Sequence, residues 1–224
     1  MLHSFGNREN PVRLLLHVIG AGHRLSRRQI DCFQSTHFIV APDLQALAGP
    51  ATDAPTDIEE IAMRFECALR EQSIEKFSVC GISAGASVAL ALARRMSNSI
   101  CHLILIAPQA RVSRIALGLQ IFICLAMPER TLLTTAAQMY RHDREIANAA
   151  LEDCEALGKP GLLSAMRALW RFDLRGALPT IITPIWVFLR FQGLREHSSC
   201  AGGRSRNSRR ETPDRAKRRT PLEY

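Results

Sequence analysis

The sequence lacks several features that would place it in a specialised class of protein. No two of its seven cysteines form a C-x-x-C pair, so no structural zinc site is expected. The longest apolar-rich stretch, residues 116–127, is far shorter than the roughly 20 residues that span a bilayer. The N-terminus has no basic segment followed by an apolar one, so no secretory signal is expected. These absences predict a cytoplasmic protein with reduced cysteines, without a membrane span, a metal or a cofactor.

Positive charge is concentrated in the last part of the chain. Of the net charge of +8, residues 190–224 contribute +6, with ten Lys or Arg against four Asp or Glu. No periodic apolar pattern remains from residue 194 onward, so residues 191–224 are predicted to form a basic, disordered tail. The only aromatic residues of this tail are Phe191 and Tyr224, which leaves few rings for base stacking. Nucleic acid is therefore not an expected partner.

The remainder of the chain alternates short apolar runs with helical patterns. The runs are predicted to be strands, at residues 12–18, 37–42, 76–81, 102–107 and 184–189. Several are apolar on both faces, which is typical of a mostly parallel sheet covered by helices. Thr56 and Glu59 form a capping box that begins one helix, and an alanine-rich helix is predicted over residues 84–96. A chain of 224 residues with this pattern predicts a single α/β domain.

A G-x-S-x-G motif lies between a predicted strand and the helix that follows it. The motif consists of Gly81, Ile82, Ser83, Ala84 and Gly85. A serine on a sharp turn at this place projects its hydroxyl above the sheet, and side chains at the two glycine positions would collide. The N-terminus of the helix offers N–H groups to a developing oxyanion. The alternative interpretation of Ser83 is a helix N-cap after a glycine turn.

Five landmarks in sequence order, including this motif, resemble the α/β-hydrolase superfamily with a serine nucleophile. The others are the strand and oxyanion loop at 14–22, the segment 41–44, the strand end at 105–108 and the strand at 182–188. The resemblance implies a mostly parallel α/β sheet with flanking helices and a helical cap, with the C-terminal part of the sheet missing. It assigns the parts of the chain as follows: residues 1–108 to the N-terminal part of the core, 109–178 to the cap, 179–190 to a further core strand and 191–224 to the tail.

The resemblance also implies a role for each residue of the motif. Ser83 would attack the carbonyl carbon of an ester or related small-molecule substrate. The backbone N–H groups of Ala84 and Ile19 would form the oxyanion hole. Gly81 and Gly85 would be the glycines of the nucleophile elbow, where they leave room for the sharp turn.

Residues outside the motif receive supporting roles from the same resemblance. His17 and Asp43 are expected to be structural residues of their loops. The cap is expected to line the substrate pocket and exclude water, with Phe122, Leu169 and Trp170 facing the sheet or the pocket.

The acid and the histidine that complete a catalytic triad are not found where the family has them. The acid should follow the strand at 184–189, and the histidine should come after a further helix and strand. No aspartate stands in the expected loop, and Glu196 and His197 are neighbours in the sequence. His23, near the oxyanion loop, and His197 are the candidates for a replacement base.

Three interpretations therefore remain open at the level of the sequence. The first is a serine hydrolase with an incomplete triad. The second is a non-catalytic binding protein of the same fold, or a truncated or frame-shifted remnant whose residues after about 190 no longer encode the fold. The third, less favoured than a tail without function, is a protein that binds nucleic acid or an acidic surface through its basic tail. The sequence leaves the substrate and the oligomeric state open.

Overall fold

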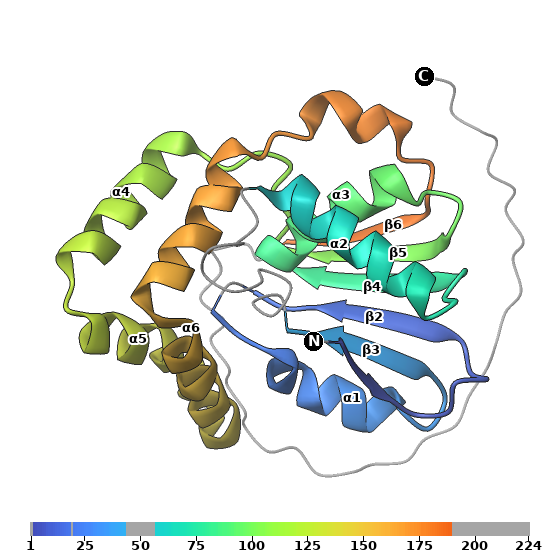
Figure 1. The fold of residues 1–224 in the computed structure, drawn as a ribbon, viewed down its shortest axis with the longest axis horizontal. Helices are drawn as coiled ribbons and strands as arrows, with labels where there is room; N and C mark the ends of the chain where they lie inside the picture. The colour runs from blue at the N-terminus through green and yellow to red at the C-terminus, as the bar shows by residue number, and fades with distance from the viewer. Residues whose placement is uncertain (1, 19, 44–56, 190–224) are drawn as a thin grey trace, which may run out of the picture. The chain divides into compact units, whose positions relative to one another are not determined.

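The structure, a computed structural model, describes residues 2–18, 20–43 and 57–189, all within one compact unit over residues 1–190 (Figure 1). Its strands are β1 (Leu2–Phe5), β2 (Val12–Leu16), β3 (Phe38–Pro42), β4 (Phe77–Ile82), β5 (Ile100–Ile106) and β6 (Ile185–Phe188). Its helical segments are η1 (His23–Ser26), α1 (Arg27–Phe33), α2 (Ile58–Glu71), α3 (Ala84–Arg95), α4 (Arg114–Ala126), α5 (Glu129–Gln138), α6 (Arg144–Arg171) and η2 (Arg175–Thr180). The predicted tail and Ile19 lie outside the described residues.

The strands form one mostly parallel sheet, which confirms the predicted fold class. Their order is β1-β3-β2-β4-β5-β6, and all neighbouring strands are parallel except β1, which runs antiparallel to β3. Each of the five predicted strands overlaps one observed strand. The strand β1 was not predicted, because Leu2–Phe5 is short and contains His3 and Ser4, so it shows no apolar run.

The main core lies between the sheet and the helices α2 and α3. Leu14, Val79 and Leu103 stand in register on β2, β4 and β5, and none of the three is exposed to solvent. All ten residues from Ala84 to Ala93 of α3 are buried, because alanines let the helix approach the strands closely. The opposite face, where Leu15 lies next to Leu14 along the strand, packs against Ile30 of α1.

The start of α2 differs from the prediction by one residue. The predicted capping box began at Thr56, whereas the N-cap is Asp57, whose carboxylate accepts a hydrogen bond from the Glu60 N–H at 2.8 Å. Aspartate is among the best N-cap residues, and its charge also interacts favourably with the helix dipole. The pair Asp57 and Glu60 has the same three-residue spacing as Thr56 and Glu59, so the sequence could not separate them.

The helices α4, α5 and α6 form a separate helical layer beside the sheet (Figure 1). They share an apolar cluster of Leu117, Cys124, Leu132, Leu162, Leu163 and Met166. The expected inward orientation of Phe122 is wrong: 67% of this side chain is exposed, because Leu117 and Cys124 occupy the inward face of α4. Leu169 packs against both apolar clusters, whereas Trp170 is 38% exposed and lies against Gly118 of α4.

The strand β6 forms an open edge in the part of the chain that the structure describes. It pairs with β5 on one side, and all four of its residues, Ile185 to Phe188, are exposed. No helix among the described residues is long and apolar enough to cross a membrane.

Candidate functional site

Ser83 occupies the turn between β4 and α3 with an unusual backbone conformation. Its φ is 53° and its ψ is −113°, in a region that non-glycine residues rarely adopt. The Ser83 N–H donates a hydrogen bond to Ile106 O at 2.9 Å, and Ser83 O accepts from Ala86 N–H at 3.0 Å. These bonds hold the turn to the end of β5 and to α3, while the serine side chain stays exposed. Such backbone strain costs about 1–3 kcal/mol and is found most often at functional sites.

The glycines on either side of Ser83 are required by close contacts. A Cβ at Gly81 would lie 2.6 Å from Gly85 O and 2.8 Å from Ala86 Cα. A Cβ at Gly85 would collide with Leu16 O and lie 2.6 Å from His17 O. The first turn of α3 therefore packs directly on the end of β2, so the loop after β2 adjoins the Ser83 turn.

The N-terminus of α3 provides a suitable place for a negative charge. Ala84 is the first residue of this helix, so its N–H has no acceptor within the helix. The helix dipole adds a partial positive charge at the same end. Ile19, the second expected donor, lies outside the described residues.

His17 is a buried residue of the loop beside Ser83. Only 1% of it is exposed, and its Nδ1 donates a hydrogen bond to Val18 O at 2.8 Å. Burial lowers the pKa of His17, even though the hydrogen bond to Val18 acts in the opposite direction. A neutral, backbone-bonded imidazole agrees with the structural role expected for this residue.

Asp43, at the end of β3, joins two histidines. Its carboxylate accepts hydrogen bonds from His3 Nε2 at 2.8 Å and from the N–H and Nδ1 of His23 at 2.8 and 2.9 Å. Burial alone would raise the pKa of Asp43, but these hydrogen bonds prevail and lower it to about 2. Asp43 therefore ties β1 and η1 to β3, as a loop-stabilising residue should. His3 was not among the predicted site residues, because it lies on the unpredicted strand β1.

The same three residues bring possible metal ligands together. Their donor atoms lie within 4.8 Å of one another. The rings of His3 and His23 are stacked, however, with centroids 3.7 Å apart and planes 22° from parallel. Nearly parallel rings do not converge on one point, so at least one ring would have to turn before both could bind one ion.

The helical layer is attached to the loop after β2. The carboxylate of Asp153 on α6 accepts a hydrogen bond from the Gly22 N–H at 2.6 Å and another from Arg24 at 2.5 Å. Its neighbour Cys154 donates through Sγ to Gly20 O at 2.9 Å. These contacts hold α6 beside the loop after β2. The same loop contacts Gly85 and therefore adjoins Ser83.

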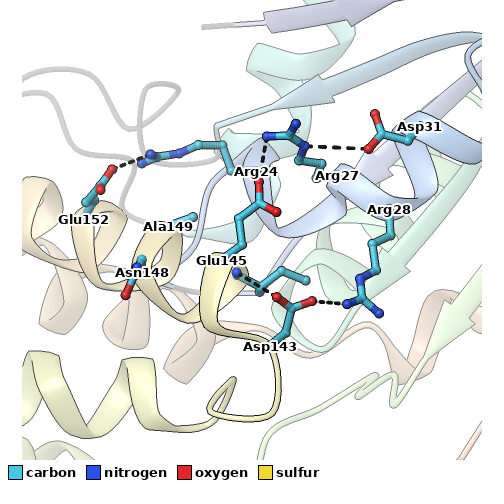
Figure 2. Close-up of a pocket in the computed structure, with 10 residues that line it drawn as sticks. Arg24, Arg27, Arg28, Asp31, Asp143, Glu145, Asn148, Ala149 and Glu152 are labelled. Atoms are coloured by element: carbon cyan, nitrogen blue, oxygen red, sulfur yellow. Dashed lines mark hydrogen bonds and ion pairs between the residues drawn. The ribbon is translucent and has the colours of Figure 1, made fainter.

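A cavity of about 310 Å³ lies between η1, α1 and the first half of α6 (Figure 2). Its arginines are paired with carboxylates: Arg24 with Glu152 at 2.5 Å, Arg27 with Glu145 at 2.8 Å and Arg28 with Asp143 at 2.5 Å. Neither Ser83 nor Ala84 lines this cavity. The cavity is therefore a polar groove at the junction of the helical layer and the core, and the chemistry expected of Ser83 would take place elsewhere.

No general base contacts Ser83 within the described residues. The Ser83 hydroxyl has no hydrogen-bond partner there, and His23 is bonded to Asp43 and stacked on His3. The segment that should carry the triad acid begins after β6, at residue 190, outside the described residues. The described structure thus brings together Ser83, Ala84 and the loop after β2, which includes the backbone-bonded His17, and none of the described histidines is hydrogen-bonded to the Ser83 hydroxyl.

Comparisons with known proteins place this arrangement in a family. The profile of the alpha/beta hydrolase family matches residues 14–221, which is most of the chain. No curated protein matches the sequence significantly.

Solved structures share the fold at low sequence identity. An esterase from Exiguobacterium antarcticum superposes with a TM-score of 0.72 at 15% identity, over 83% of this chain and 75% of the esterase. A hydrolase from Pseudomonas aeruginosa PA01 gives 0.71 at 17% identity, over 83% and 74% of the two chains. A thermophilic esterase from Thermogutta terrifontis gives 0.70 at 18% identity, over 84% and 74%. With the family profile matched over most of its length and the same sheet and helices observed, this chain belongs to the alpha/beta hydrolase family.

Proposed function

We propose that this chain carries a serine-hydrolase site for an ester or related small-molecule substrate, with Ser83 as the nucleophile at a nucleophile elbow. The observation that supports this most strongly is the strained, exposed conformation of Ser83 between β4 and α3, with φ 53°. An N-cap serine of an ordinary helix has no need of this conformation, and its side chain makes no capping hydrogen bond here.

The proposed reaction begins with attack of Ser83 Oγ on the substrate carbonyl carbon. The C–O bond forms as the carbonyl π electrons move onto the oxygen, which becomes an oxyanion. The Ala84 N–H and the Ile19 N–H stabilise this charge. Collapse of the intermediate breaks the bond to the alcohol oxygen, which takes up the proton that the base removed from Ser83, and leaves an acyl-serine that water hydrolyses to the carboxylic acid and free Ser83. Both steps require a base that removes a proton from the attacking oxygen.

Within the described residues, the proposed site lacks an identified base for Ser83. Family members supply it from the segment after the strand equivalent to β6, whereas here Glu196 and His197 are adjacent in the sequence. Adjacent residues cannot reproduce an acid and a histidine that are separated by a helix and a strand. We therefore propose that turnover is low, because a serine hydroxyl without a positioned base is a weak nucleophile.

The helical layer, residues 109–178, is the proposed cap over the substrate, between a core of residues 1–108 and the core strand at 179–190. Its contacts through Asp153 and Cys154 with the loop after β2 support this arrangement. We take the proposed substrate class, an ester, from two esterases with the same fold, which are 15% and 18% identical to this chain.

A fluorophosphonate probe tests whether Ser83 is a nucleophile. We expect slow but specific labelling of the wild-type protein that the Ser83→Ala variant abolishes. Ser73→Ala is the matched control, because Ser73 is also exposed and has a positive φ, 58°, but lies outside the motif. Equal labelling of all three proteins, or labelling of none, would favour the second proposed function, a non-catalytic binding protein of the same fold. That function is favoured by the sequence of residues 190–195, which contains no aspartate where the resemblance expects the triad acid.

A further inference from the structure

The helix α4 presents a large apolar surface to solvent. The exposed fractions are 87% for Ile115, 61% for Leu119, 67% for Phe122, 48% for Ile123 and 50% for Leu125. Figure 1 shows α4 at the margin of the helical layer, with α6 between it and the sheet. An exposed apolar patch of several large side chains marks an interaction surface more often than chance exposure.

The exposed residues form one continuous face of the helix. Ile115, Leu119 and Phe122 follow the i, i+4, i+7 spacing of a single helical stripe. Leu117 and Cys124, which are buried against α6, lie on the opposite side of the same helix. The helix is therefore apolar on both sides, a pattern that normally belongs to a helix covered on both sides.

The segment that contains this face is positively charged and has no acidic residue, although Glu129 follows it directly and Asp173 lies beside Arg111. Residues 109–128 contain Arg111 and Arg114 and no Asp or Glu. Arg114 has no ion pair among the described residues, and Arg111 has only an exposed pair with Asp173 at 3.8 Å. Trp170 lies against Gly118 at the border of the apolar face and adds an amphipathic indole ring.

We propose that α4 binds the surface of a bilayer that contains anionic phospholipids, with its axis in the plane of the interface. Ile115, Leu119 and Phe122 enter the acyl boundary, and Arg111 and Arg114 contact the phosphates. The helix has 13 residues and is too short to span, so it lies on the membrane. A second copy of the chain fits this surface less well, because another α4 offers no carboxylate to these arginines.

Vesicle sedimentation of the full chain tests this proposal. We expect binding to vesicles of phosphatidylcholine and phosphatidylglycerol, weaker binding to phosphatidylcholine alone, and a loss of affinity as salt is raised. Phe122→Ser should lower the affinity about tenfold, from the apolar area that no longer enters the membrane. Arg114→Gln should lower it about fivefold, for one cation near the surface.

The matched control is Ile182→Ser, since Ile182 is 77% exposed but lies outside α4. This variant should bind like the wild type. A spectroscopic readout completes the test: in a Trp186→Phe background, Trp170 fluorescence should shift to the blue when phosphatidylglycerol vesicles are added.

Two results would overturn the proposal. Residues 190–224 carry a net charge of +6, so binding that Phe122→Ser leaves unchanged would belong to that segment and not to α4. A change in oligomeric state in Phe122→Ser without lipid, seen by light scattering and accompanied by no loss of vesicle binding, would assign the face to a second copy of the chain.

Discussion

At the scale of single residues, the turn at Ser83 requires glycine at two neighbouring positions. A Cβ at Gly81 or Gly85 would collide with backbone atoms. The absence of a side chain at these positions lets α3 pack against the end of β2. The sequence motif predicted the need for both glycines. It could not predict which atoms they meet, because Leu16 and His17 are distant in the sequence and are brought near only by the pairing of β2 with β4.

Gly85→Ala should be strongly destabilising. The new methyl group would collide with Leu16 O and His17 O, which belong to a buried strand end and cannot move freely. We expect a loss of about 3 kcal/mol in the free energy of unfolding, measured by urea denaturation. Gly176→Ala is the control, because nothing lies within 4 Å of a Cβ at that position. Equal stability of the two variants would contradict the described packing of α3 on β2.

At the scale of elements, the long periodic segments were predictable and the short or two-sided ones were not. The strand β4 and the helix α3 follow directly from their composition, and both lie where they were expected. The strand β1 depends on pairing with β3, and no local sequence pattern predicts this contact. The helix α4 was assigned the wrong inward face, because a helix with apolar residues all round gives no periodic signal to choose between Phe122 and Leu117.

In the site, the residues within one motif were predictable and the contacts between distant segments were not. The motif located Ser83 and Ala84 on the observed turn and helix start. It could not show that His3 and His23 would meet at Asp43, because that contact joins three elements that are separate in the sequence.

A carboxylate between α2 and α3 should make stability depend on pH. Burial of Glu66 raises its pKa, but the guanidinium groups of Arg70 and Arg95 outweigh burial and lower the pKa below its ordinary value. A lowered folded-state pKa means that the stabilisation is complete above the unfolded value, about 4.3, and is lost as the pH falls through the folded value. Glu66→Gln should thus cost about 1 kcal/mol at neutral pH and almost nothing in acid.

Thermal unfolding as a function of pH measures this difference. Glu75→Gln, at an exposed position after α2, is the control and should follow the wild type at every pH. If the unfolding temperature of Glu66→Gln stayed below that of the wild type by the same amount in strong acid, the carboxylate would not act through its charge.

The attachment of α6 to the core should depend on Asp153 more than on its neighbour Glu152. Both carboxylates bind Arg24, but Asp153 is 13% exposed and also accepts the Gly22 N–H, whereas Glu152 is 63% exposed. Asp153→Asn should lower the free energy of unfolding by about 1.5 kcal/mol and speed proteolysis within residues 109–178. Glu152→Gln should change stability by less than about 0.5 kcal/mol. The reverse order would mean that the Gly22 contact does not anchor the helix.

At the scale of the whole molecule, the sheet is well covered at its centre and open at β6. Ile185 to Phe188 expose apolar side chains on the last described strand, and the ladder beyond β6 has no partner within the described residues. An exposed strand edge of this kind promotes pairing with other chains. The composition changes directly after it, from apolar runs to a segment with a net charge of +6.

A charge on the open edge should therefore suppress aggregation. Val187, at the centre of the exposed run, is 52% exposed, and Val187→Lys should reduce light scattering of concentrated protein without lowering its unfolding temperature. Met139→Lys is the control for added charge alone, since Met139 is 77% exposed and lies after α5, away from the strand. An equal reduction in both variants would trace the effect to net charge and not to the edge.

The composition change near residue 190 leads to a prediction about the gene. If a frame shift accounts for this change in composition, another reading frame past codon 190 should encode an aspartate loop, a strand and a later histidine. Translation of the downstream sequence in all frames checks this, and the absence of those elements from every frame would reject the frame shift as the explanation.

Whether Ser83 is activated is tested most directly by the hydrolysis rate of p-nitrophenyl acetate, measured for the purified chain and for its Ser83→Ala variant. The described structure places Ser83 on a strained turn next to the N-terminus of α3, and within the described residues it brings no base to the Ser83 hydroxyl. It therefore predicts a wild-type rate that exceeds the variant by much less than the several orders of magnitude that a triad base contributes. A wild-type rate about a thousandfold above that of Ser83→Ala would show that a histidine activates the serine, and would contradict the account.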